Sequence, residues 1–240
     1  VLAEDKLFAT LDPTSRAIEL PDGRSLLLVD TVGLIRRLPH HLVEAFKSTL
    51  EESACADIII HVCDVSDPEA AEKADVTLKT LADLGAAEIP VVTVLNKCDL
   101  VPAGQLKQLL QNVSEMLAFC KHVPILTVSA LKGTGLNKIL PMARKIHEEC
   151  AIRVPTGQLN RAMEEVLTRH QPPVVKRVRA KFFYLTQAES QPPTFVFFVS
   201  DADRVPESYA RYLERALRRI FGITHAPMRL HLRSSHKKSQ

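Results

Sequence analysis

The four residues Asn96-Lys97-Cys98-Asp99 have the types and spacing needed to recognise a guanine base, and they directly follow an apolar run. The carboxylate of an N-K-x-D motif can accept hydrogen bonds from both N–H groups on the pairing edge of guanine. Adenine offers no matching pair of donors, so it would leave a buried carboxylate unpaired. The aliphatic stem of Lys97 can cover the plane of the base. The plain alternative is a polar turn after a strand, and we favour the nucleotide interpretation because further motifs accompany this one.

A second motif, D-x-x-G, spans residues 30–33 at the end of another apolar run. In phosphate-binding proteins of this kind the Asp supports the shell of a Mg²⁺ ion, and the amide of the Gly reaches the terminal phosphate of the nucleotide. Thr10 lies upstream and is a candidate Mg²⁺ ligand through its hydroxyl, with a turn or capping threonine as the alternative.

A third motif, S-A-x at residues 129–131, would supply backbone amides near the O6 atom of guanine. All three motifs follow predicted strands, and α/β sheets bind ligands at the carboxyl ends of their strands. The predicted ligands are GTP or GDP with Mg²⁺, and Thr10 and Asp30 are the predicted metal residues. The predicted nucleotide residues are Thr10, Asp30, Thr31, Val32, Gly33, Asn96, Lys97, Asp99, Ser129, Ala130 and Leu131.

The loop that normally holds the phosphates does not occur in the 240 residues, which contain no G-x-x-x-x-G-K-[ST] sequence. Its backbone amides and Lys cradle the phosphates in nucleotide-binding proteins of this type. The chain begins with Val1 rather than Met, so we expect it to start inside a longer protein, downstream of that loop. Leu34 follows the D-x-x-G motif where many GTPases have a water-orienting Gln, and we name no catalytic residue. We expect GTP hydrolysis in the full-length protein and no activity in this chain alone.

The apolar pattern of the first 150 residues predicts the alternating strands and helices of an α/β sheet. An Asp-Gly turn between two apolar runs predicts a β-hairpin over residues 18–29. Further strands are predicted over residues 57–64, 90–95 and 124–128, and helices over residues 41–53, 69–84, 104–120 and 137–150.

After Pro155 the pattern changes to the order α-β-β-α-β, which describes a compact α+β domain. Thr156 is the expected N-cap of its first helix, and Gly222 the expected C-cap of its second. The helices are predicted over residues 156–170 and 207–221, and the strands over residues 179–187, 194–200 and 228–232.

Composition and charge narrow the class of protein. No apolar run reaches the roughly 20 residues that a membrane span requires, so we expect no membrane partner. The five cysteines show neither C-x-x-C nor zinc spacing, which favours a reducing cytoplasm.

The net charge is distributed unevenly along the chain. Residues 151–240 contain 16 Lys and Arg against 7 Asp and Glu, a net charge of +9, whereas the whole chain carries only +3. This asymmetry indicates a polyanionic partner for the C-terminal part, with a solvated charged surface as the alternative.

Two families resemble the chain. Residues 3–14, 30–35 and 38–52 resemble the HflX family of ribosome-binding GTPases, and residues 129–135, 156–161, 191–199 and 207–214 resemble Der (EngA), a GTPase family of large-subunit assembly. By this resemblance Thr10 is the switch I threonine, Asp30 and Gly33 belong to switch II, and the C-terminal domain is KH-like. No G-x-x-G loop occurs in residues 151–240, so ordinary KH clamping of nucleotides is not expected. The combination fits either a natural fusion or a chimera.

The resulting expectation is a P-loop NTPase-type G domain without its first strand, P-loop and first helix (residues 1–150), a small α+β KH-like domain (151–235) and a disordered basic tail (236–240). The expected function is GTP-dependent switching and GTP hydrolysis on the ribosome, in large-subunit assembly or ribosome rescue, with the large subunit and rRNA as partners. The alternative is a non-catalytic RNA- or ribosome-binding protein whose G domain has decayed or is truncated. The sequence assigns no oligomeric state.

Overall fold

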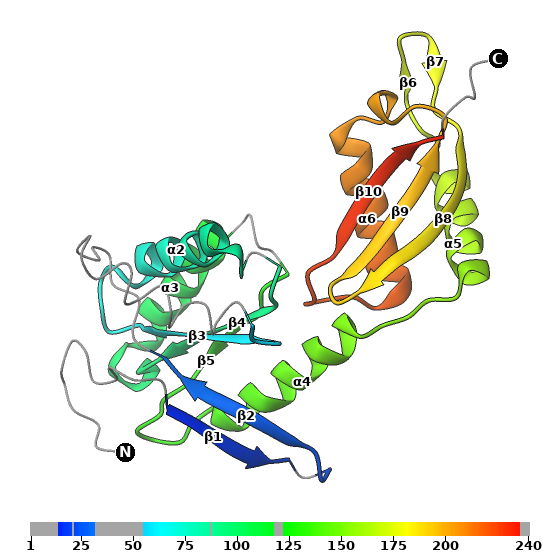
Figure 1. Cartoon of the computed structure of the whole chain (residues 1–240). Helices are drawn as coiled ribbons and strands as arrows, with labels where there is room; N and C mark the ends of the chain where they lie inside the picture. Colours follow the sequence, from blue (N-terminus) through cyan, green and yellow to red (C-terminus); the bar gives the residue numbers. More distant parts are fainter. Residues whose placement is uncertain (1–13, 21, 32–54, 87, 118–121, 236–240) are drawn as a thin grey trace.

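The computed structural model describes residues 14–20, 22–31, 55–86, 88–117 and 122–235 (Figure 1). The predicted helix over residues 41–53 and the predicted tail over 236–240 lie outside the described residues. So do four of the residues singled out in the sequence, Thr10, Val32, Gly33 and Leu34. We call the described part up to Cys150 the N-terminal unit and residues 151–235 the C-terminal unit.

The predicted hairpin is confirmed at the start of the N-terminal unit. Strand β1 (Thr14–Glu19) pairs antiparallel with β2 (Ser25–Asp30), and the two form a sheet of their own. Gly23 in the connecting turn has a φ of 79°, a conformation that glycine adopts without strain. The turn is tied to the last helix of the N-terminal unit, because the Asp22 carboxylate lies 2.8 Å from the Arg144 guanidinium.

The predicted α/β sheet is present as three parallel strands in the order β3-β4-β5. They are β3 (Ile59–Asp64), β4 (Val91–Asn96) and β5 (Ile125–Thr127). Strand β4 is in the middle and buried on both faces, as a continuous apolar strand requires.

Helices cover both faces of this sheet (Figure 1). On one face, α2 (Ala70–Leu81) and α3 (Ala103–Met116) pack against Val91 and Leu95. On the other face, α4 (Ile139–Cys150) packs against Val92 and Val94. Helix α2 continues into a π-helical turn (Ala82–Ala86) that ends near Gly85, whose φ is 86°. Two short 3-10 turns, Cys98–Leu100 and Leu136–Lys138, follow β4 and precede α4.

The C-terminal unit is an α+β sandwich. Its sheet has the order β10-β9-β8, from β8 (Phe182–Ser190), β9 (Pro193–Val199) and β10 (Arg229–Ser234), with β10 parallel and β8 antiparallel to β9. Helices α5 (Thr156–Arg169) and α6 (Glu207–Phe221) bury the face that carries Phe195 and Phe197, and a 3-10 turn (Ala202–Arg204) precedes α6.

Two predictions for this unit are wrong and one is confirmed. Thr156 is not the N-cap of α5: Pro155 occupies that position, and its carbonyl accepts hydrogen bonds from the amides of Gln158 and Leu159. Residue 179 does not begin the long strand, because the chain first forms a small hairpin of β6 (Val174–Val175) and β7 (Val178–Arg179). Gly222 does close α6, with a left-handed φ of 69°.

The two units share one hydrophobic core. Ile146 and Cys150 of α4 belong to the same buried cluster as Leu159 of α5 and Ile223 after α6. Polar contacts extend this interface: Nδ1 of His225 lies 3.1 Å from the carbonyl oxygen of His122, and Arg229 forms an ion pair with Glu88. The C-terminal unit therefore packs against α4 and against the loops that carry Glu88 and His122 in the N-terminal unit.

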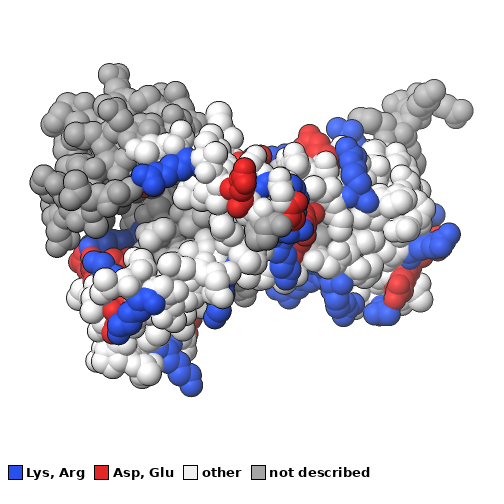
Figure 2. Space-filling model, turned by 90° about the horizontal axis from the view of Figure 1, so that it is seen from below, with Lys and Arg blue, Asp and Glu red and all other residues white. Residues whose placement is uncertain are grey.

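The surface of the C-terminal unit carries many Lys and Arg side chains in the view of Figure 2, in agreement with its net charge. None of the described helices is long and apolar enough to cross a membrane.

Candidate nucleotide-binding site

The polar residues predicted to read guanine meet at the carboxyl ends of neighbouring parallel strands. Asn96 is the last residue of β4, and Ser129 and Ala130 come shortly after β5, which pairs with β4 through Leu95 and Thr127. A parallel sheet brings these ends to one edge, where α/β proteins bind ligands. The structure therefore brings the N-K-x-D and S-A-x motifs together, as the sequence predicts.

Asn96 forms the direct link between the two motifs. Its side-chain Oδ1 accepts a hydrogen bond of 3.0 Å from the backbone amide of Ala130. The backbone adds a second link, because the amide of Cys98 donates to the carbonyl of Val128 at 3.1 Å. Asn96 thus acts as a positioning residue that fixes the S-A-x loop relative to Asp99.

Asp99 lies half-buried at the centre of this arrangement. A hydrogen bond with the Ser129 side chain is the main reason that the pKa of the Asp99 carboxyl lies below its usual value, and the positive charge of Lys132 acts in the same direction. The Lys132 ammonium is 3.8 Å from the Asp99 carboxylate. A carboxylate that stays ionised is an acceptor only, which is the property that recognition of two guanine N–H donors requires.

Lys97 has an unusual backbone conformation, and its side chain is paired with Asp64, which the sequence did not identify as a site residue. Its φ is 63°, and its ammonium lies 2.7 Å from a carboxylate oxygen of Asp64, the last residue of β3. Burial tends to raise the pKa of Asp64, but hydrogen bonds from Lys97 and Ser66 outweigh it and the pKa is lowered. The position of Asp64 at the end of a buried strand, next to β4, was the signal that could have identified it.

The loop after β5 depends on glycine at one position. Gly135 has a φ of 77°, and a Cβ atom there would lie 2.6 Å from the carbonyl oxygen of Thr127. The amide of Ser129 donates to the carbonyl of Thr134 at 3.0 Å, which closes the loop, and the Ser129 hydroxyl accepts from the amide of Lys132 at 3.1 Å. In the middle of the loop, the Leu131 side chain is 88% exposed.

The D-x-x-G motif is not joined to this arrangement in the described residues. Asp30 and Thr31 lie at the end of β2, which forms a separate two-stranded sheet with β1, and both are exposed. Thr10, Val32 and Gly33 lie outside the described residues. Within the described part of the chain no group of three His, Cys, Asp or Glu side chains could hold a metal ion. Only Asp30 of the predicted Mg²⁺ residues is described, so the geometry of that site stays a prediction.

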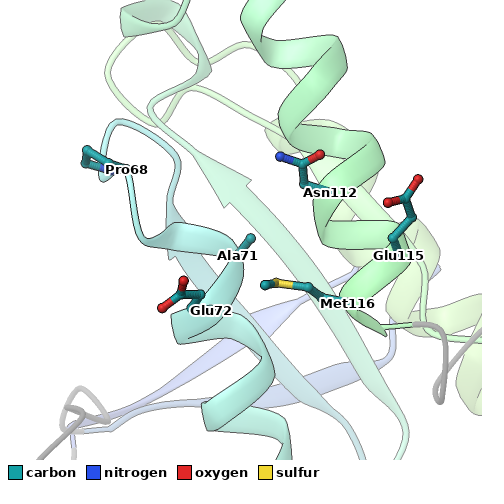
Figure 3. A pocket seen from close by; sticks show the side chains of 6 residues that line it. All are labelled: Pro68, Ala71, Glu72, Asn112, Glu115 and Met116. Atoms are coloured by element: carbon teal, nitrogen blue, oxygen red, sulfur yellow. The ribbon is translucent and has the colours of Figure 1, made fainter.

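A surface groove of about 470 Å³ lies between α2 and α3, away from the nucleotide motifs (Figure 3). In Figure 3 the side chain of Met116 reaches from α3 toward α2. The groove is lined by Pro68, Ala71, Glu72, Asn112, Glu115 and Met116. None of these residues belongs to a predicted nucleotide motif, so we assign no ligand to the groove.

Comparison with known families assigns a class to each unit. Residues 1–97 match the family model described as 50S ribosome-binding GTPase, and residues 153–233 match the KH-domain-like C-terminal domain of EngA bacterial GTPase enzymes. The N-terminal unit is therefore similar in part to a ribosome-binding GTPase domain, and the C-terminal unit is similar to the KH-like domain of EngA enzymes.

Individual relatives refine this picture. GTPase Der from Nitratidesulfovibrio vulgaris is 49% identical over 242 residues, which is 100% of this chain and 48% of the relative. GTPase HflX from Akkermansia muciniphila is 63% identical over 102 residues, which is 42% of this chain and 23% of the relative. A crystal structure of SsGBP in complex with GDP is 32% identical, covers 56% of this chain and 43% of that chain, and has a TM-score of 0.49.

The chain spans about half the length of the Der relatives that it matches. A single Der relative covers both units, so their combination does not require a chimera. The HflX match has a higher identity but covers a shorter segment, and the Der relatives match that segment as well.

Proposed function

We propose that this chain is part of a cytoplasmic, GTP-binding and GTP-hydrolysing factor that acts on the ribosome, in large-subunit assembly or rescue. The observation that carries this proposal is the contact between Asn96 and the amide of Ala130, next to the ionised Asp99. It fixes a carboxylate acceptor and the S-A-x loop at one sheet edge, as recognition of guanine requires. The family model that residues 1–97 match supports the ribosome as the partner.

We propose further that the phosphate-binding half of the site lies on a first strand, P-loop and first helix outside this chain. The exposed apolar side chains of the neighbouring strands support this. Val62 on the edge strand β3 is 60% exposed and Leu27 on β2 is 65% exposed. Among the described residues one edge of β3 is unpaired, which is costly in water. A further strand between β2 and β3 would pair this edge, and a helix following it would cover apolar side chains on the face of the sheet.

In this arrangement the residues of the chain have distinct tasks. Asp99 binds the base, Asn96 positions the loop at residues 129–131, and the stem of Lys97 covers the base while Asp64 holds its ammonium. Thr10 and Asp30 would hold Mg²⁺, which neutralises phosphate charge when bound. We place the domain boundary at residue 150, and we expect this chain alone to bind GTP weakly and not to hydrolyse it.

The substitution Asp99→Asn in the full-length protein tests the proposal. Asn presents a donor where guanine needs an acceptor, so GTP affinity should fall about 100-fold or more, because two hydrogen bonds to a charged group are lost. Xanthosine triphosphate, which presents a carbonyl where guanine has its amine, should then bind better than GTP. Competition binding with both nucleotides measures this.

The exposed Asp83 provides a control, since Asp83→Asn removes the same charge outside the site. Unchanged GTP affinity in Asp99→Asn would refute the site. Ribosome binding by a full-length protein that binds no GTP would instead support the alternative, a non-catalytic RNA- or ribosome-binding protein.

A further inference from the structure

The β6–β7 hairpin places two cations where a tight turn usually has Asn and Gly. Only Lys176 and Arg177 separate its paired strands, and both have positive φ, 50° and 61°. Two central residues with positive φ are the signature of a type I′ turn. Side chains with a Cβ atom are strained in this conformation, which is why Asn-Gly is preferred there.

The hairpin is positioned to reach a partner outside the chain. It projects from the end of the C-terminal unit that is far from the N-terminal unit (Figure 1). Lys176 and Arg177 are exposed, and no carboxylate of the described residues is in an ion pair with either of them. Backbone strain that persists at an exposed site indicates a function, and two unneutralised cations indicate an anionic ligand.

The sheet beside the hairpin offers an aromatic surface. Tyr184 of β8 and Arg233 of β10 are register partners of Phe198 on β9, so the three side chains form a row on the face opposite Phe197 and the two helices. The rings of Tyr184 and Phe198 stack with centroids 4.2 Å apart, and Tyr184 is 45% exposed. This row lies where β8 begins, a few residues after β7 ends. Exposed aromatic rings beside cations are typical of surfaces that bind single-stranded nucleic acid.

We propose that the β6–β7 hairpin and the adjoining row on the sheet form a binding site for single-stranded RNA. Lys176 and Arg177 contact the phosphates, and Tyr184 and Arg233 contact the bases or the neighbouring backbone. The net charge of +9 on residues 151–240 attracts the polyanion to this end of the molecule. The site needs no G-x-x-G loop, which residues 151–240 lack. This inference rests on the proposed ribosomal function and names the surface that meets RNA.

RNA is favoured over an acidic protein by the aromatic row. An acidic protein surface would need the cations of the hairpin but not an exposed aromatic ring. Nucleic acid uses both, because phosphates pair with the cations while every base offers a flat face to an aromatic side chain.

The double substitution Lys176→Asn with Arg177→Gly tests the proposal without endangering the fold. It produces the preferred Asn-Gly turn, so the thermal midpoint should stay equal or rise. Binding of a labelled 20-nucleotide single-stranded RNA to the 240-residue chain should weaken about tenfold or more near physiological salt, and the slope of log K against log salt should fall by about 1.4. The control Arg161→Gln with Arg215→Gln removes two exposed charges from α5 and α6 and should change affinity less than threefold.

Two further variants separate the contribution of charge from that of the aromatic ring. Arg177→Lys keeps the charge and should bind RNA like the unchanged chain, and Tyr184→Ala should weaken RNA binding without changing the salt slope. The proposal is overturned if the hairpin variant binds RNA normally, if the control variant weakens binding equally, or if polyglutamate competes as well as RNA at equal charge. Absence of RNA binding by the unchanged chain also overturns it. The nucleotide competition with Asp99→Asn is measured separately, so failure of one proposal is distinguished from failure of the other.

Discussion

Glu149 is the residue whose substitution most directly tests how the two units are held together. It lies in the last turn of α4 and is 8% exposed. One of its carboxylate oxygens, Oε2, accepts hydrogen bonds from three successive backbone amides after α6, those of Thr224 at 2.8 Å, His225 at 2.6 Å and Ala226 at 2.9 Å. A single side chain of the N-terminal unit therefore satisfies three donors of the C-terminal unit.

The substitution Glu149→Ala should be strongly destabilising. A hydrogen bond to a charged group contributes about 1.5–3 kcal/mol, and a buried donor left without an acceptor costs about 1–3 kcal/mol. The three bonds share one oxygen and do not add fully, so we expect a loss of about 3–5 kcal/mol, in the range for breaking a buried charged contact. Glu149→Gln keeps a weaker acceptor and should lose about 1–3 kcal/mol. Typical domains are stable by only about 5–15 kcal/mol, so either loss is measurable.

Urea unfolding of the chain, combined with hydrogen exchange of the amides at residues 224–226, measures both the size and the place of the effect. The neighbouring Glu148 is the matched control, because its side chain is 54% exposed and pairs with Arg144 on the surface. Glu148→Gln should change stability by less than about 0.5 kcal/mol. Normal protection of the three amides in Glu149→Ala, with a loss below about 1 kcal/mol, would refute the reasoning.

Two further predictions follow from local geometry and burial. Gly135→Ala should lower stability by about 2 kcal/mol or more, because its Cβ would meet the Thr127 carbonyl; an unchanged urea midpoint would contradict this. Burial lowers the pKa of both His61 and His122 from 6.5 to about 4, helped at His122 by nearby Arg218. As the pH falls, the unfolded chain binds protons at these histidines at a higher pH than the folded chain does. The free energy of unfolding is therefore at its full value above pH 6.5 and decreases between pH 6.5 and 4, by up to about 3 kcal/mol per histidine. Urea titrations across this range should show a smaller loss in His61→Gln; an identical loss would exclude His61.

Much of the N-terminal unit could be predicted because its signals are local. The apolar runs before Asp64 and Asn96 are continuous, as in strands buried on both faces, and an Asp-Gly pair marks the first hairpin. The ends of elements were predicted less accurately. The helix predicted over residues 104–120 ends at Met116, and the strand predicted over residues 124–128 covers only three residues. The β6–β7 hairpin was missed because a Lys-Arg turn breaks the residue preference by which such turns are recognised.

The sequence by itself determined which residues could read guanine, since the chemistry of Asn96, Asp99 and Ser129 depends on residue type and on their positions after strands. The tertiary structure alone decided which partners fix them, such as Asp64 for Lys97 and Ala130 for Asn96. It also decided the role of Glu149, an acidic residue near a helix C-terminus, where the helix dipole disfavours it. Its three amide donors lie about 75 residues further along the chain, and only folding brings them within hydrogen-bonding distance.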